Sequence, residues 1–230
     1  MESESLQLFT SNSTRGVLGE LLPQFEQATG TRVAASYDPA LVMLKRIDAG
    51  ETADLAILGQ GAIDALAMAG KIVPESRRTL ARCGVGVGTA VGGPKPDVSS
   101  VEAFKAALLA AKSIAHTTSG ASGIHFSNII KRLGIAAEIE PKAVRNEGGL
   151  IGELVVRGEA ELAIQQIPEL MAVPGLELVG PLPQELQSIS VLAAGIFVTS
   201  KRAAAARALL EFLGTPAAMR VFRAKGLEPA

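Results

Sequence analysis

The hydrophobic period changes repeatedly along the first 70 residues, and this alternation constrains the fold more than any other feature. Short apolar runs typical of strands are each followed by a segment with apolar residues at helical spacing. The strand-like runs lie at 6–10, 31–37 and 53–59, and the helical segments at 14–29, 39–49 and 63–69. A glycine follows each helical segment, as at helix C-termini. This order predicts an α/β fold with a mostly parallel sheet flanked by helices.

The chain of 230 residues is long enough for two such lobes. Strand-like and helical segments alternate again in the middle of the chain, and the last 40 residues or so add one strand and two helices. We expect lobe 1 to combine residues 1–83 with 188–230, and lobe 2 to comprise residues 84–187. The chain would then cross twice between the lobes, with a hinge near 82–86 and 186–191 and a ligand cleft between the lobes.

Composition narrows the classes of partner. Basic and acidic side chains number 22 and 23, so the net charge is −1 and no nucleic-acid partner is expected. Aromatic residues are 3% of the chain, which leaves few rings for stacking on bases. One cysteine and two histidines give no cluster with metal-ligand spacing, so we expect no metal and no cofactor.

The amino terminus carries neither the basic nor the apolar segment of a signal peptide. No apolar run reaches the roughly 18 residues that a membrane span needs, so no span is expected. The protein would be periplasmic if a signal peptide was removed and cytoplasmic otherwise, and we expect a monomer.

A polar turn follows the first strand, at the point where a helix begins. Ser11, Asn12, Ser13 and Thr14 are more polar groups than one helix cap requires, and either Ser13 or Thr14 would serve as the N-cap. Ligands bind at the carboxyl ends of parallel strands, and helix N-termini favour anions. Arg15 is unfavourable at a helix start unless an anion offsets its charge. We therefore predict that Ser11, Asn12, Ser13 and Arg15 bind a small anion, with plain capping and a surface arginine as the alternative.

A second polar loop is expected in lobe 2. The segment 117–123 combines hydroxyl side chains with glycines that permit close backbone approach, and a helix is expected from about residue 124. The predicted ligand-binding residues of lobe 2 are Thr117, Thr118, Ser119, Ser122, Gly123 and, at the end of a later apolar strand, Gln166. A purely structural loop is the alternative, and the Gly-Lys-Ser/Thr ending of a nucleotide-binding loop is absent.

Two segments resemble the type II periplasmic solute-binding proteins, and most of all their molybdate-binding branch. One is Leu-Phe-Thr-Ser-Asn-Ser at 8–13, and the other is Arg-Ile-Asp-Ala-Gly-Glu-Thr-Ala-Asp-Leu-Ala-Ile-Leu at 46–58. The segments 120–125 and 156–164 are similar to that branch's ligand loop and helix–strand junction in the second lobe. The resemblance covers nearly the whole chain. It implies a two-lobed fold that closes over a small anion and delivers it to the membrane component of an ABC importer.

The chain departs from the molybdate-binding pattern at two positions. The stretch 37–41 has no hydroxyl side chain where that branch binds the oxyanion, apart from the phenol of Tyr37, and Gln166 stands where a tyrosine is expected. An organic carboxylate therefore fits the chain better than molybdate, although an oxyanion stays open. Binding without catalysis is favoured. The alternative is an isomerase on the same scaffold, similar to aconitate isomerase, in which His125 or Glu147 would move a proton.

Overall fold

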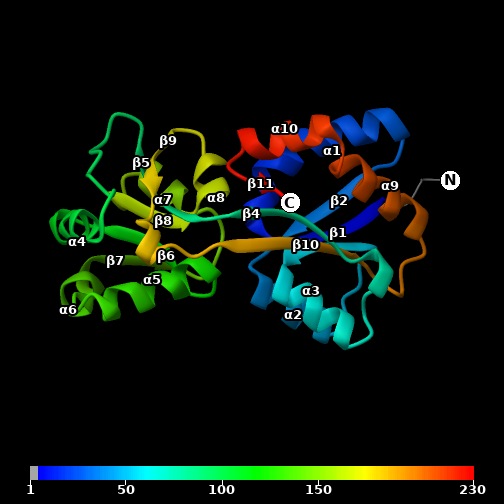
Figure 1. Cartoon of the computed structure of the whole chain (residues 1–230), viewed down its shortest axis with the longest axis horizontal. Helices are drawn as coiled ribbons and strands as arrows, with labels where there is room; N and C mark the ends of the chain where they lie inside the picture. The colour runs from blue at the N-terminus through cyan, green and yellow to red at the C-terminus, as the bar shows by residue number, and fades with distance from the viewer. Residues whose placement is uncertain (1–4) are drawn as a thin grey trace. The chain divides into compact units, whose positions relative to one another are not determined.

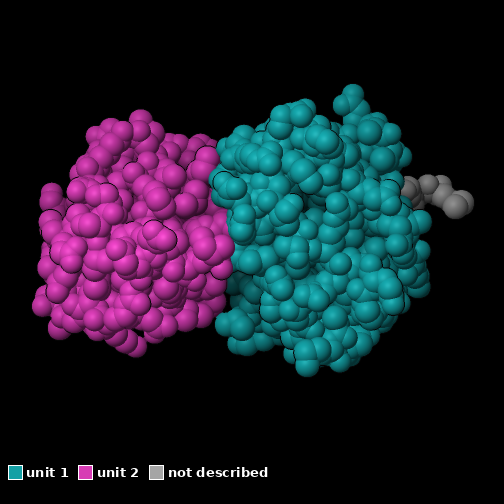
Figure 2. Space-filling model, in the orientation of Figure 1, with its two compact units in different colours: residues 1–82, 190–230 teal, residues 83–189 magenta. Residues whose placement is uncertain are grey.

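The computed structural model describes residues 5–230, which form two compact units (Figure 2). Unit 1 comprises Met1–Arg82 and Ser190–Ala230, and unit 2 comprises Cys83–Ile189. Residues 1–4, on which the expected absence of a signal peptide partly depends, lie outside the described residues. In the described part of the chain, no helix combines the length and apolar character that crossing a membrane requires.

Unit 1 is built on a six-stranded sheet in the order β11-β4-β10-β3-β1-β2 (Figure 1). Its strands are β1 (Leu6–Thr10), β2 (Val33–Tyr37), β3 (Leu55–Gly59), β4 (Arg78–Cys83), β10 (Ser190–Ile196) and β11 (Glu228–Pro229). Its α-helices are α1 (Arg15–Thr29), α2 (Ala40–Asp48), α3 (Gln60–Met68), α9 (Ala203–Leu213) and α10 (Pro216–Ala224). Short 3-10 helices lie at Asn12–Thr14 and Pro74–Ser76. The strand–helix order predicted from the hydrophobic period is confirmed for residues 6–68.

Unit 2 is built on a five-stranded sheet in the order β7-β6-β8-β5-β9 (Figure 1). Its strands are β5 (Val85–Ala90), β6 (Ile114–Thr117), β7 (Ala143–Asn146), β8 (Leu162–Gln166) and β9 (Leu176–Pro181). Its α-helices are α4 (Val101–Ala110), α5 (Ala121–Arg132), α6 (Ala136–Ile139), α7 (Gly152–Val156) and α8 (Ile167–Met171). Short 3-10 helices lie at Glu140–Lys142 and Gln184–Leu186.

The two sheets repeat one arrangement. In unit 1, β1 pairs in parallel with β2 and β3, and β10 runs antiparallel to β3. In unit 2, β6 pairs in parallel with β7 and β8, and β5 runs antiparallel to β8. The expected parallel arrangement thus holds for three strands of each sheet, and the antiparallel strands make both sheets mixed. The central parallel strand of each unit, β1 or β6, leads into one of the two predicted anion-binding segments.

Apolar side chains from strands and covering helices form the core of each unit. In unit 1, Phe9, Met43, Leu58 and Ile63 belong to one buried cluster between the sheet and α2 and α3. In unit 2, a larger cluster joins α4 and α5 to the sheet through Phe104, Phe126 and Ile164, among others. Because the carboxyl ends of β1 and β6 emerge from these cores, the turns that follow them are held by fixed strands.

Several elements differ from the sequence predictions. Strands β4 and β5 follow one another along the chain with only Gly84 between them. Strand β7 was not predicted, and its last residue, Asn146, lies in parallel register with Thr117 of β6. Helix α5 starts at Ala121 and not near residue 124.

Candidate functional site

The turn after β1 is fixed mainly by its own hydrogen bonds. The Ser11 N–H donates to the Ile57 carbonyl at 3.1 Å, which ties the turn to β3. The Thr14 N–H and hydroxyl both donate to the Ser11 carbonyl, at 3.1 and 2.9 Å. The Ser11 and Ser13 hydroxyls lie 2.7 Å apart. The turn therefore holds a defined shape, with hydroxyl and backbone groups gathered at the carboxyl end of the central strand.

Thr14, one of the two expected caps, is the N-cap residue of α1. Residues Asn12–Thr14 form a 3-10 turn ahead of α1, and neither Ser11 nor Thr14 makes a side-chain cap hydrogen bond. The Thr14 hydroxyl lies 2.7 Å from that of Thr10 and donates to the Ser11 carbonyl. It therefore stabilises the turn and does not cap α1. The first N–H groups of a helix have no partner within the helix. The N–H groups at the start of this turn are thus suited to donate hydrogen bonds to an anion.

Arg15 is held beside this turn by two contacts. Its Nη2 donates to Asn12 Oδ1 at 3.3 Å, and its guanidinium lies over the Tyr37 ring, 4.3 Å from the centroid. Burial raises the pKa of Tyr37, and the positive charge of Arg15 partly opposes that rise. The structure therefore brings the four predicted residues of unit 1 together, namely Ser11, Asn12, Ser13 and Arg15. Tyr37 was missed as a support for Arg15, although its place at the end of the neighbouring strand was visible in the sequence.

The turn after β6 is shorter than expected. Ser122 and Gly123 lie in the first turn of α5 and are buried, so they are not loop residues. The hydroxyls of Thr118 and Ser119 donate to the Asn146 and Glu147 carbonyls, which joins the turn to the end of β7. These two hydroxyl protons are already used, and the backbone N–H groups at the start of α5 remain the anion-binding groups of this turn.

Thr117 is the most distinctive side chain of the second turn. It is 3% exposed, and its hydroxyl has no hydrogen-bond partner within residues 5–230. The hydroxyl is enclosed by two glycines: a Cβ at Gly120 would lie 2.5 Å from it, and a Cβ at Gly123 would lie 2.6 Å from it. Buried hydroxyls are normally hydrogen-bonded, so an orphaned one at a helix N-terminus is an expected partner for a ligand oxygen.

Gln166 ends β8 and is buried, and its Oε1 accepts the thiol of Cys83 at 3.4 Å. Burial raises the pKa of Cys83 to about 12, with the nearby Glu169 carboxyl adding to the rise. The thiol is therefore neutral at physiological pH and unsuited to nucleophilic chemistry. The neighbouring Gln165 has a structural function, because its amide bonds to the Ile151 N–H at 2.9 Å and the Gly149 carbonyl at 2.8 Å.

The two candidate bases differ in their surroundings. His125 Nε2 lies 2.7 Å from the Leu186 carbonyl and donates to it, which fixes the ring and leaves Nδ1 as the proton acceptor. Glu147 is exposed in the turn after β7, and its backbone carbonyl accepts the Ser119 hydroxyl. Among residues 5–230, no group of three His, Cys, Asp or Glu side chains could hold a metal ion.

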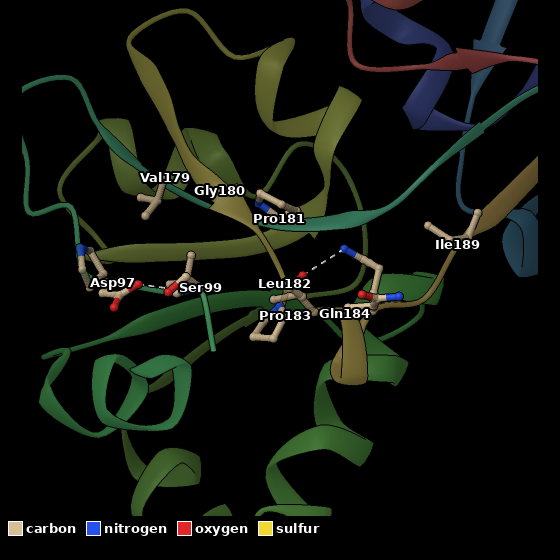
Figure 3. A pocket seen from close by; sticks show the side chains of 12 residues that line it. Asp97, Ser99, Val179, Gly180, Pro181, Leu182, Pro183, Gln184 and Ile189 are labelled. Carbon is tan, nitrogen blue, oxygen red and sulfur yellow. Dashed lines mark hydrogen bonds between the residues drawn. The ribbon is translucent and has the colours of Figure 1, made fainter. Parts of the chain in front are cut away.

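A separate hollow lies in unit 2 between the loop before α4 and the end of β9 with the segment that follows it (Figure 3). Asp97 Oδ1 accepts the Ser99 N–H at 2.9 Å on one side of it, and Gln187 Nε2 donates to the Leu182 carbonyl at 3.4 Å on the other. The remaining lining is largely apolar, with several prolines. No predicted site residue lines this hollow, so it is distinct from the turn after β6.

Comparisons with known proteins agree with this architecture. The family model of the bacterial extracellular solute-binding proteins matches residues 6–228. An aconitate isomerase from a Pseudomonas species is 32% identical over 231 residues, covering 98% of this chain and 88% of that protein.

Two solved structures share the fold at low identity. The periplasmic molybdate-binding protein of Azotobacter vinelandii superposes with a TM-score of 0.81 at 19% identity, over 97% of this chain and 98% of the other. A sulfate-binding protein of Mycobacterium tuberculosis gives a TM-score of 0.76 at 18% identity, over 98% and 87%. With the family match spanning almost every described residue, the chain belongs to the bacterial extracellular solute-binding protein family.

Proposed function

We propose that this protein binds a small organic anion, with carboxylates preferred over metal oxyanions. The observation that carries the proposal is Arg15, which Tyr37 and Asn12 hold beside a turn rich in hydroxyl and N–H groups. A guanidinium presents a planar pair of donors that matches a carboxylate. Hydroxyls and helix N-terminal N–H groups complete the recognition of a small acid without any covalent step.

The second turn supports the same class of ligand. Thr117 offers a buried hydroxyl without a partner in residues 5–230, next to the N-terminus of a 12-residue helix. The two turns follow the central parallel strands of their units, where ligands of α/β sheets bind. We propose that Ser11, Asn12, Ser13 and Arg15 are the anion-binding residues of unit 1, and that Thr117 and the backbone at the start of α5 are the anion-binding groups of unit 2. The contribution of Gln166, the predicted hinge and the monomeric state stay predictions.

The names of the relatives support an anionic ligand but do not agree on which anion it is. The two solved structures are named for molybdate and sulfate binding, and the 32% identical relative is named for an enzyme of a tricarboxylate. The identity to this relative is higher than to either solved structure, and the stretch 37–41 has no aliphatic hydroxyl. Both points favour a carboxylate. The family also makes an extracellular or periplasmic location and delivery to an ABC importer the expected biological context.

The binding proposal is tested by isothermal titration calorimetry with trans-aconitate, citrate, succinate, sulfate and molybdate. We expect at least one carboxylate to bind, and Arg15→Gln to weaken it by about tenfold or more, as for loss of a charge-assisted hydrogen bond. Lys95→Gln removes the same charge from an exposed ion pair with Glu177 in unit 2 and is the matched control. Equal affinity in wild type and Arg15→Gln would remove Arg15 from the proposal.

A second candidate function is isomerisation of an unsaturated carboxylate, and the 32% identical aconitate isomerase is the observation that favours it. Such a reaction needs one base that takes a proton from a carbon beside the double bond and returns it at the far end of the allylic system. His125 Nδ1 and the Glu147 carboxylate are the candidate bases. Proton NMR of trans-aconitate tests this: conversion to its double-bond isomer that His125→Gln or Glu147→Gln abolishes supports catalysis, and no conversion at high protein concentration excludes it.

A further inference from the structure

Two arginine side chains lie against the end of β2, one on each face of the strand. Side chains alternate along a strand, so Ser36 and Asp38 share one face and Tyr37 occupies the other. Arg15 covers the Tyr37 face. On the opposite face, Arg46 of α2 donates from Nη1 to Ser36 Oγ at 2.8 Å and to Asp38 Oδ2 at 2.5 Å.

Asp38 lies next to the anion turn. Its N–H donates to the Thr10 carbonyl at 3.1 Å, and the β1–β2 register pairs Thr10 with Tyr37. The next residues along the two strands are Ser11, the first residue of the turn, and Asp38. Their backbones therefore lie side by side, at about the 4.8 Å spacing of neighbouring strands. A free carboxylate at this position would repel any anion in the turn.

Arg46 is anchored so that its charge stays beside Asp38. Its guanidinium lies 4.9 Å from the centroid of the Phe9 ring, and its Nε and Nη2 donate to Glu51 Oε2 at 3.0 and 2.8 Å. The hydrogen bond to Glu51, followed by that to Asp38, raises the pKa of Arg46. Arg46 is therefore permanently charged, and Phe9 and Glu51 keep its fork directed at Asp38.

We propose that Arg46 is a specificity-determining positioning residue that offsets the charge of Asp38 and immobilises its carboxylate, so that the turn after β1 accepts a carboxylate ligand. This inference rests on the proposed anion-binding function. Arg46 acts through Asp38 and does not itself touch the ligand. An alternative in which Arg46 only ties α2 to β2 predicts lost stability without a charge-specific effect on binding.

A charge-rescue cycle separates these alternatives, with trans-aconitate and citrate as the calorimetric probes. Arg46→Gln should weaken carboxylate affinity about five- to tenfold, because it leaves the Asp38 carboxylate without its counter-charge at the end of β2, beside the turn. Adding Asp38→Asn to Arg46→Gln should restore affinity to within about threefold of wild type, and Asp38→Asn alone should bind equally or more tightly. The Arg46→Gln defect should shrink in 0.5 M salt because salt screens the uncovered charge.

Lys71→Gln is the matched control, because it removes the same charge from an ion pair with Asp48, the last residue of α2, and not from the pair with Asp38. It should leave affinity unchanged. Arg46→Lys keeps the charge without the fork and should bind within about threefold of wild type if neutralisation matters most. If Arg46→Gln fails to fold, Arg46→Lys and the double variant carry the test.

The outcomes distinguish the inference from the function on which it rests. If the wild type binds neither carboxylate, the proposed ligand class fails first. If the wild type binds but Arg46→Gln binds equally well, the inference is overturned. The inference is also overturned if Arg46→Gln lowers carboxylate affinity and the added Asp38→Asn does not restore it. Arg46 would then act through the structure of β2 and α2 and not through the Asp38 charge.

Discussion

Replacing Thr117 by valine should make the ligand-free protein more stable. Valine keeps the shape of threonine and removes a hydroxyl that has no partner within residues 5–230, at a site 3% exposed. An unsatisfied buried polar group costs about 1–3 kcal/mol, so we expect the free energy of unfolding to rise by about 1–2 kcal/mol. For a chain of this size, that corresponds to a melting temperature roughly 2–8 °C higher.

The same substitution should weaken ligand binding. A hydrogen bond to a charged group contributes about 1.5–3 kcal/mol, so Thr117→Val should lower carboxylate affinity by roughly 10- to 150-fold. Stability is measured by urea unfolding without ligand, and affinity by calorimetry with the carboxylate that binds the wild type. Opposite signs in the two measurements are the signature of a group kept for function at a cost in stability.

Thr89→Val is the matched control in the same unit. Thr89 is also a buried strand residue, 1% exposed, but its hydroxyl donates to the Glu161 carbonyl at 3.5 Å. This variant should lose up to about 1 kcal/mol of stability and keep its affinity. If Thr117→Val destabilises the protein as Thr89→Val does and leaves affinity unchanged, the Thr117 hydroxyl is satisfied in solution and does not bind the ligand.

Three further predictions concern packing and protonation. Gly123→Ala should lower the free energy of unfolding, measured in urea, by about 3 kcal/mol or more, because its Cβ would lie 1.8 Å from a backbone carbonyl oxygen. Gly19→Ala, which has open space around its Cβ, should raise the free energy of unfolding by up to about 1 kcal/mol. Absorbance at 295 nm should show Tyr37, the single tyrosine of the chain, titrating above its ordinary pKa, and Arg15→Gln should raise that pKa further, whereas a fall would contradict the contact. Burial lowers the pKa of His116, so the unfolded chain binds a proton at this imidazole more readily than the folded protein does. The free energy of unfolding should therefore fall as the pH drops below about 6.5. His116→Asn should reduce the difference in this free energy between urea unfolding at pH 7.5 and at pH 5.5.

The fold was largely predictable because it depends on strong local signals. Apolar runs marked β1 and β3, and Gly30, Gly50 and Gly70 mark helix ends with positive φ angles of 71°, 98° and 68°. Short or charged strands were missed for the opposite reason. Strand β7 is four residues with two polar ones at its end, and it forms through its register with β6, which no local pattern encodes.

The candidate site was predictable in composition and less so in detail. The polar residues after β1 and β6 were visible as clusters, but their hydrogen bonds were not. Thr14 was expected to cap α1, yet its hydroxyl bonds to the Ser11 carbonyl, because threonine side chains compete for nearby backbone groups. The pairing of Asp38 with Arg46 joins a strand end to a helix and depends on how α2 packs against the sheet. Sequence alone shows an acidic residue near an anion turn without its counter-charge.

Binding of a small carboxylate is the central property proposed for this protein. Calorimetric titration of the wild type with trans-aconitate, citrate, succinate, sulfate and molybdate under identical buffer and salt tests this claim most directly. We predict saturable binding of at least one carboxylate, with no heat of binding for molybdate or sulfate at the same concentrations. Tight binding of molybdate alone, or binding of none of the five anions, would contradict the account.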